Sequence, residues 1–145
     1  MKKYLLRKVR EFFQVEPVTG IEEETLQFIL GACEDSHPKE FMGLLSAEIT
    51  GMGRVITNVN LVPAAKRSET SVFYSREHIP NSTNIVGSVH SHPNGVVQPS
   101  EADMNSFVAG TTHIIVGAPY TEDSWKAFDK NGAAKDLEVY PSEFF

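Results

Sequence analysis

The chain has 145 residues, of which 41% are hydrophobic and 22% charged, a balance typical of one globular domain. Its 13 Lys and Arg against 19 Asp and Glu give a formal net charge of −6, which argues against non-specific nucleic-acid binding because that needs a basic surface. The single cysteine, Cys33, cannot form an internal disulfide or a zinc site of several thiolates. Any bound metal therefore needs histidine and carboxylate ligands.

The N-terminal segment lacks the pattern of a signal peptide or a membrane span. Arg7, Lys8 and Arg10 interrupt its apolar run after a few residues, whereas a signal peptide needs roughly 7–15 apolar residues in a row and a span about 20. We therefore expect a cytoplasmic protein with no membrane partner. The apolar residues of 1–15 recur at helical spacing, which predicts an amphipathic extension over residues 1–18 that could contact a partner or form a homodimer.

Residues 19–145 are expected to form a single domain. Thr19-Gly-Ile-Glu22 resembles a capping box, and the apolar residues that follow it at helical spacing predict a helix to about Glu34. Cys33 falls on the apolar side of this helix, where we interpret it as a core residue and not as a reactive thiol.

β-Branched and bulky apolar residues between turn signals predict the strands. In chain order these are residues 41–49, 54–62, 72–74, 85–92, 112–118, 125–128 and 137–140. A second helix is predicted over 100–109, with Gly110 as its C-terminal stop. Lys130-Asn-Gly132 is a strong hairpin signal and is expected to join the last two strands. The order of helix, strands, helix and strands predicts one α/β or α+β domain with a mixed sheet.

The clearest chemical pattern is formed by His90 and His92 on one predicted strand. Alternate residues of a strand share a face, so both imidazoles are expected on the same side, close enough for one tetrahedral zinc ion. Pro93 ends the strand, and Ser100 is expected to cap the following helix, with Asp103 one turn along it. That position turns a carboxylate back toward the strand end. His90, His92 and Asp103 are therefore a candidate three-ligand metal site with a fourth position for water.

Each part of this pattern also has a simpler interpretation. A Ser-x-x-Asp sequence is a common capping box with no metal, and a carboxylate that binds a metal is less available to its own helix start. Glu40, just before the strand 41–49, is a candidate to take a proton from a metal-activated water, but its local sequence also fits a solvated surface acid. The other histidines are interpreted as structural; they are His37, His78 and His113.

Taken together, these residues resemble the JAMM motif of the MPN+ metalloproteases. Glu40 is followed far downstream by His90-Ser-His92-Pro93, and then by Ser100 and Asp103. The flanking segments that also match are 38–45 and 87–93, with 113–116 and 124–126 similar to small archaeal members. The resemblance implies a single MPN/JAB-like metalloprotease domain over 19–145, with a mixed curved β-sheet flanked by helices in a cytidine-deaminase-like layering.

The resemblance also implies a reaction. One Zn²⁺ ion would be bound by His90, His92 and Asp103. Glu40 would accept a proton from the zinc-bound water, and Ser100 would donate a hydrogen bond to the developing oxyanion. The expected activity is that of an isopeptidase or peptidase acting at the C-terminal glycine tail of a ubiquitin-like protein. The expected partner is then a ubiquitin-like protein or its conjugates, and not a nucleic acid.

Several alternatives are open. A trimming peptidase that matures a sulfur-carrier precursor would use the same residues. A non-catalytic scaffold module would need a metal site closed by a fourth protein ligand, a position that Glu40 could fill. An iron oxygenase with two histidines and one carboxylate would leave Glu40 and Ser100 without a function. The chain has no long insertion after Asp103, so selection of a conjugate linkage by such an insertion is not expected.

Overall fold

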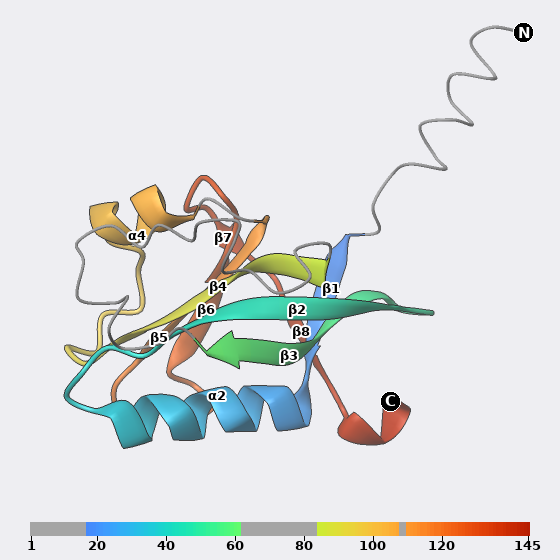
Figure 1. Ribbon diagram of the computed structural model, residues 1–145, viewed down its shortest axis with the longest axis horizontal. Coiled ribbons are helices and arrows are strands. Elements are labelled where there is room, and N and C mark those ends of the chain that lie inside the picture. Colours follow the sequence, from blue (N-terminus) through green and yellow to red (C-terminus); the bar gives the residue numbers. More distant parts are fainter. Residues whose placement is uncertain (1–16, 62–83, 108–109) are drawn as a thin grey trace, which may run out of the picture.

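The structure is a computed structural model that describes residues 17–61, 84–107 and 110–145 (Figure 1). Its elements in chain order are β1 (Val18–Glu22), α2 (Glu23–Ser36), β2 (Met42–Thr50), β3 (Gly53–Leu61), β4 (Ile85–His92), α4 (Glu101–Ser106), β5 (Thr112–Gly117), β6 (Trp125–Phe128), β7 (Ala134–Lys135), β8 (Glu138–Tyr140) and the 3-10 helix η3 (Ser142–Phe144).

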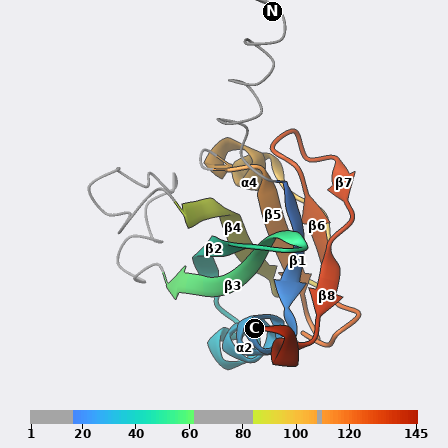
Figure 2. The same ribbon diagram turned by 90° about the vertical axis from the view of Figure 1, so that its right-hand side faces the viewer.

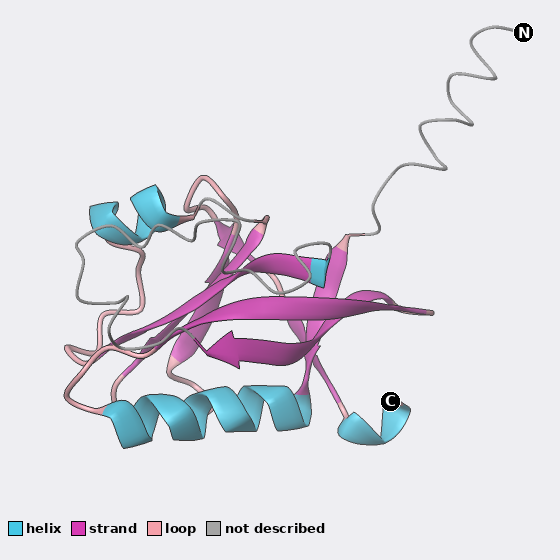
Figure 3. Ribbon diagram, in the orientation of Figure 1, coloured by secondary structure: helices cyan, strands magenta, loops and turns pink. Residues whose placement is uncertain are grey.

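One mixed sheet organises the fold, with its 8 strands in the order β7-β6-β5-β4-β2-β3-β1-β8. β4 runs parallel to β5, and β1 runs parallel to both β3 and β8, whereas the other neighbours are antiparallel. Helix α2 lies along one face of the curved sheet and α4 lies on the opposite side (Figure 1, Figure 3). The view in Figure 2 shows the sheet between these two helices. The expected single α+β domain with a mixed sheet flanked by helices is confirmed.

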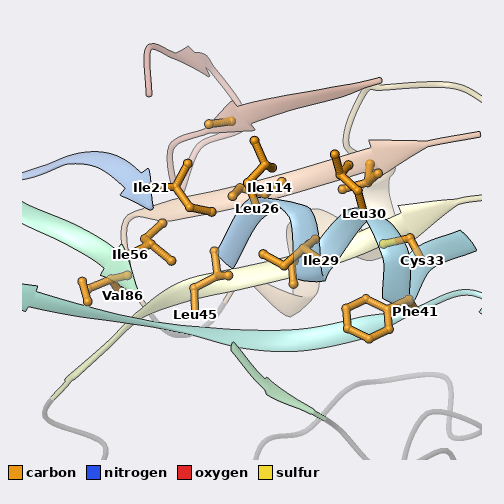
Figure 4. Packing of buried hydrophobic residues seen from close by; sticks show 14 of the residues in the cluster. Ile21, Leu26, Ile29, Leu30, Cys33, Phe41, Leu45, Ile56, Val86 and Ile114 are labelled. Atoms are coloured by element: carbon orange, nitrogen blue, oxygen red, sulfur yellow. The ribbon is translucent and has the colours of Figure 1, made fainter. Parts of the chain in front are cut away.

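The main core lies between α2 and the sheet. The buried apolar side chains of α2 recur every three or four residues and are Leu26, Ile29, Leu30 and Cys33. Sheet residues that pack with them include Ile21, Leu45, Ile56 and Ile114 (Figure 4). Fully burying one such side chain contributes about 1.5–3 kcal/mol, so this layer holds the sheet in place. The core position predicted for Cys33 is confirmed, and burial raises the pKa of its thiol to about 12, which keeps it protonated.

A smaller apolar cluster lies on the other face of the sheet. It contains Phe107, Ile115 and Phe128, with Val97 and Met104 packed against it. Helix α4 belongs to the crossover between the parallel strands β4 and β5, so the chain leaves the sheet at the carboxyl end of β4. Ligand sites of parallel sheets usually lie at the carboxyl ends of the strands. The residues predicted as metal ligands lie at this end of β4.

The first described helix begins later than the sequence predicts. Thr19 lies in β1, and its hydroxyl donates to Met52 O over 2.7 Å. Helix α2 begins at Glu23, and its N-cap Glu22 makes no side-chain cap hydrogen bond. The prediction of a capping box from Thr19 to Glu22 was wrong because this segment pairs with β3 on one side and β8 on the other. Those partners are far away in the chain, so local sequence does not indicate them.

The C-terminal hairpin has a different second strand from the one predicted. The chain turns back at Gly132, whose φ is +82°, and Asp129 Oδ1 accepts hydrogen bonds from two backbone N–H groups of the turn. The strand that returns against β6 is Ala134–Lys135, and not residues 137–140. Residues Glu138–Tyr140 form β8, at the other edge of the sheet, and pair in parallel with β1. The turn was predicted correctly and its partner strand wrongly.

The other predicted elements that can be compared agree closely with the structure. Strands β2 to β6 match their predicted ranges to within one residue at either end. The second predicted helix is α4, which ends at Ser106 and not near residue 109. The predicted extension 1–18, except for its last two residues, lies outside the described part of the chain, as do the strand 72–74 and His78. None of the described helices is long and apolar enough to cross a membrane.

The close approach of β4 and β5 depends on Gly87. A Cβ at this position would overlap the backbone carbonyl of Thr112, because the two residues are partners across the parallel pair. Backbone atoms cannot rotate away, so we expect Gly87→Ala to lower the free energy of unfolding by about 3 kcal/mol, the upper end of ordinary overpacking. Chemical denaturation would measure this change.

Gly31→Ala is the matched control, because a Cβ at Gly31 meets nothing within 4 Å. Alanine stabilises a helix interior by roughly 0.5–1 kcal/mol relative to glycine, so this variant should be at least as stable as the wild type. A Gly87→Ala variant of wild-type stability would contradict the close packing of β4 on β5.

Candidate metal centre

Strand β4 supports the centre. Ser88, His90 and His92 are alternate residues of this strand and share one face of the sheet. Both imidazoles are buried, with 3% of His90 and 9% of His92 exposed. Met42 of β2 and Ile115 of β5 are the sheet partners of His90, so its backbone is held from both sides. The carboxyl end of β4 is therefore a rigid support for two imidazoles.

Asp103 brings a carboxylate to these imidazoles from the first turn of α4. Its Oδ2 lies 2.8 Å from His92 Nε2, and its Oδ1 lies 3.7 Å from His90 Nδ1. Only 8% of Asp103 is exposed. The structure thus brings together the three side chains that the sequence predicts as metal ligands.

The same carboxylate also caps α4. Ser100 N donates to Asp103 Oδ2 over 2.7 Å, and Asp103 N donates to Ser100 Oγ over 3.1 Å, so the capping box is complete. The two interpretations of the Ser-x-x-Asp sequence are therefore compatible. Oδ2 is shared between the helix cap and His92, while Oδ1 faces His90. The cap fixes the direction of the carboxylate toward the end of β4.

A backbone carbonyl orients His92. Its Nδ1 lies 2.7 Å from Val96 O, and a carbonyl oxygen only accepts hydrogen bonds, so Nδ1 carries a proton. Val96 N in turn donates to Asn94 Oδ1, which shapes the loop after β4. His92 therefore presents Nε2 to Asp103. A ring N–H on a backbone carbonyl is also the usual outer contact of a metal-binding imidazole.

The electrostatics distinguish the two imidazoles. Burial lowers the pKa of His90 to about 4, although Asp103 acts in the opposite direction, so this ring is neutral at neutral pH. The hydrogen bond to Asp103 raises the pKa of His92 despite its burial, and a backbone carbonyl and Glu40 also raise it. Burial favours a higher pKa for Asp103, but hydrogen bonds from His92 and Ser100 bring it down to about 2. The centre therefore combines a permanent anion with two ring nitrogens.

This donor set fits a small divalent cation. Ligands about 2.0–2.1 Å from a tetrahedral zinc ion lie roughly 3.3 Å from one another. The His92–Asp103 distance of 2.8 Å is shorter and the His90–Asp103 distance of 3.7 Å is longer, so shifts of about half an ångström would bring both to that value. Within 17–61, 84–107 and 110–145, no three His, Cys, Asp or Glu side chains already form a metal cluster.

Glu40 approaches the centre through an extension of the β2–β4 ladder. Beyond the last residues that the two strands pair, Phe41 N donates to Ser91 Oγ over 2.6 Å and Ser91 N donates to Phe41 O over 2.9 Å. Continuing this antiparallel register places Glu40 beside His92 on the same face. The effect of its charge on the pKa of His92 agrees with this position. Glu40 is exposed, unlike the three predicted ligands.

Ser100 is the fifth predicted residue and lies exposed at the N-cap of α4. Its Oγ accepts the hydrogen bond from Asp103 N through a lone pair. A hydroxyl that accepts in this way keeps its own proton to donate. Ser100 can therefore complete the cap and also donate a hydrogen bond to another oxygen beside the centre.

Comparisons with known proteins identify the family. The model for prokaryotic homologs of the JAB domain matches residues 22–128. A probable metalloprotease from Haloferax volcanii is 40% identical over an alignment of 137 residues that covers 90% of this chain and 85% of that protein. The chain belongs to the prokaryotic JAB-domain family.

Solved structures agree with this assignment. A JAB1/MPN domain protein from Archaeoglobus fulgidus is 34% identical, with a TM-score of 0.65 over 83% of this chain and 98% of that one. A structure described as "JAMM: A Metalloprotease-like Zinc Site in the Proteasome and Signalosome" is 32% identical, with a TM-score of 0.64 over 86% and 99%. The predicted membership of the JAMM/MPN+ family is confirmed, and this JAB domain is a JAMM-type metalloprotease. The individual roles of its five motif residues stay predictions.

Sequence reasoning missed the polar residues that hold these ligands. Ser88 Oγ lies 3.2 Å from His90 Nε2 and 2.8 Å from His113 Nδ1. The period of two along β4 was an available signal for Ser88, since it lies on the same face as the two predicted ligands. His113 was interpreted as structural, and it is fully buried at 0% exposure. No local signal pairs Ser91 with Phe41, because the two are 50 residues apart.

Asp103 and Ser100 share the helix cap but differ in their predicted contact with metal. We expect Asp103→Ala to lose metal binding and also about 1 kcal/mol of stability from the cap. Ser100→Ala should lose a similar cap contribution and keep its metal. Equilibrium dialysis against zinc followed by metal analysis measures the first effect, and chemical denaturation of chelated protein measures the second. Equal metal content in the two variants would show that Asp103 is not a ligand.

Acid is expected to destabilise the metal-free domain through His113. Burial lowers the pKa of this imidazole to about 4 from its ordinary value of 6.5. On acidification the unfolded chain therefore takes up this proton first, and stability falls as the pH drops through that window. Between about pH 7 and about pH 5, the loss from His113 is on the order of 2 kcal/mol.

The measurement is the free energy of unfolding at both pH values for the chelated wild type and for His113→Phe. The phenyl ring can keep the stack that His113 makes on Phe107. Between the two pH values, the free energy of unfolding should fall by about 2 kcal/mol more in the wild type than in the variant. An identical pH dependence in the two proteins would mean that His113 titrates normally in the folded state.

Proposed function

We propose that this JAB domain is a zinc-dependent isopeptidase or peptidase that cleaves at the C-terminal glycine tail of a ubiquitin-like protein. One zinc ion would be held by His90, His92 and Asp103. The observation that carries the proposal is the convergence of two ring nitrogens and one carboxylate at the carboxyl end of β4. The similarity to a metalloprotease-like zinc site supports zinc as the metal. The substrate class rests on the resemblance to the JAMM motif.

The chemistry divides between the metal and Glu40. A zinc ion held by His90, His92 and Asp103 would supply a Lewis acid that makes water a nucleophile near neutral pH. Glu40 lies beside His92 by register, and its charge raises the pKa of that imidazole. From there its exposed carboxylate can take a proton from the attacking water and pass it to the leaving amine.

Ser100 would stabilise the carbonyl oxygen of the substrate. The hydroxyl is exposed beside Asp103, where its oxygen accepts from Asp103 N, and rotation about the C–O bond can turn its proton from the carboxylate to a substrate oxygen. A hydrogen bond to an oxygen that becomes negative during the reaction is worth more in the transition state than in the ground state. Losing one such donor lowers the rate by about 10²–10³-fold.

An extended tail suits the rim of this centre. Exposed residues border it on two sides, with Glu40 before β2 and Ser100 before α4, while Val96 in the intervening loop is 51% exposed. An extended peptide can gain affinity from main-chain hydrogen bonds alone. Glycines at the scissile end place no side chain between the peptide carbonyl and the buried ligands.

The alternatives differ in what the domain would cleave. We would incubate the protein with a set of small ubiquitin-like proteins, each carrying a reporter on its C-terminal glycine through either an isopeptide bond or a linear peptide extension. Cleavage of both, lost on chelation and restored by zinc, is the expected result. Cleavage of the linear extension alone would identify a trimming peptidase. Binding without cleavage would identify a scaffold module and overturn the proposal.

Replacing Glu40 tests the mechanism. We expect Glu40→Gln to keep zinc and to lower the cleavage rate by about 10²–10⁴-fold, the usual contribution of a positioned proton-transfer group. Glu48→Gln is the control, because Glu48 is an exposed acid near the other end of β2, where it pairs with Val55, and should leave the rate unchanged. Metal analysis and single-turnover rates on the same preparations separate the two effects. A Glu40→Gln enzyme of wild-type rate would remove Glu40 from the mechanism.

A further inference from the structure

A buried series of polar side chains runs from the proposed metal centre across the sheet, from β4 to β5. It consists of His90, Ser88 and His113, which are 3%, 1% and 0% exposed. Ser88 of β4 and His113 of β5 are direct partners in the parallel register, so the sheet itself places them side by side. This series of polar groups ends at the backbone oxygen of Gly110, which lies 3.3 Å from His113 Nε2. The mechanism proposed above uses neither Ser88 nor His113.

The donor and acceptor of each hydrogen bond in this series follow from the group at its end, the carbonyl oxygen of Gly110. Gly110 O can only accept, so His113 Nε2 donates to it, and the neutral ring offers a lone pair at Nδ1. Ser88 Oγ, 2.8 Å away, then donates its single proton to that nitrogen. The hydroxyl oxygen is left to accept from His90 Nε2 at 3.2 Å. His90 therefore carries its proton on Nε2 and has its lone pair on Nδ1, the atom that faces Asp103 Oδ1.

We propose that Ser88 and His113 are positioning residues that hold His90 in the tautomer and orientation needed to bind the metal through Nδ1. The inference rests on the proposed metal site and adds two residues to it. Without the Ser88 hydroxyl, no acceptor holds the proton on Nε2, and the Asp103 carboxylate that faces Nδ1 favours the form with its proton there. That form has no lone pair directed at the centre. Outer contacts of this kind change metal affinity by about 10–100-fold.

Phe107 holds the far end of this series in place. Its ring stacks on His113 with a centroid distance of 3.9 Å and an interplanar angle of 5°, and it lies 6.1 Å from the ring of His90. Phe107 is itself buried, at 7% exposure, directly after α4. The stack restricts rotation of the His113 ring, so His113 Nδ1 stays directed at Ser88. Packing and hydrogen bonding thus orient the same imidazole.

The test compares Ser88→Ala, His113→Phe and a control, Thr112→Val. Thr112 is also fully buried in β5 and loses a hydrogen bond from Lys135 in the variant, but the described contacts of its side chain do not include His90. Zinc affinity is measured by competition with a chromophoric chelator. The tautomer of His90 is read in metal-free protein labelled with ¹⁵N-histidine, from long-range ¹H–¹⁵N spectra recorded above the ordinary histidine pKa.

We expect Ser88→Ala and His113→Phe to bind zinc about 10–100-fold more weakly than the wild type and to lose the Nε2-protonated form of His90. The control Thr112→Val should be unchanged in both respects. If Ser88 and His113 had only a structural role, replacing them would lower the free energy of unfolding and leave the zinc affinity and the His90 tautomer unchanged. Ser88→Ala removes a single oxygen atom and should still fold. It therefore tests the inference on its own if His113→Phe does not fold. Wild-type zinc affinity and an unchanged His90 tautomer in Ser88→Ala would overturn the inference. If the wild type itself bound no zinc, the proposed function would fail. The tautomer of His90 in metal-free protein would still show whether Ser88 and His113 orient this imidazole.

Discussion

The carboxylate of Asp103 connects the two halves of the centre. It completes the capping box at the start of α4 through Ser100, and it contacts the imidazoles at the end of β4. Burial opposes a charge at this place, yet the hydrogen bonds to the carboxylate keep its pKa low, so the anion is present at every pH at which the domain would work. A helix start and a strand end are therefore held together by one group, and the geometry of the proposed metal site is a consequence of how α4 begins.

The loop between them makes this possible. Beyond His92 the chain turns at Gly95, whose φ is +81° and whose N–H donates to His92 O over 3.0 Å. Ala118 N, just after β5, donates to the same carbonyl over 3.1 Å, so the end of β4 is tied to its parallel neighbour. Val96 O then returns to orient the His92 ring. The residues between His92 and Ser100 are thus enough to reverse the chain, and the spacing of the motif reflects that path.

This explains what could be read from the sequence. His90, His92, Ser100 and Asp103 are close in the chain, and the periods of a strand and a helix turn are sufficient to bring them together. The tie between Phe41 and Ser91 that positions Glu40, and the pair of Ser88 with His113, depend on sheet register across long separations. The same reason accounts for the errors at β1 and β8, whose pairing joins the two ends of the described chain. Local periodicity carries no information on which distant strand becomes a neighbour.

Successive side chains of β4 point to opposite faces of the sheet, and the two faces have different functions. Val89 belongs to the core beneath α2, while Ser91 contacts Cys33 and the backbone of Phe41 on that side. Ser88, His90 and His92 occupy the other face. Each proposed ligand has an outer partner: the Ser88 side chain of the same strand for His90, the Val96 carbonyl of the following loop for His92 and the N-terminus of α4 for Asp103. These partners belong to the strand, the loop and the helix start themselves, so the fold orients the proposed ligands before any metal binds.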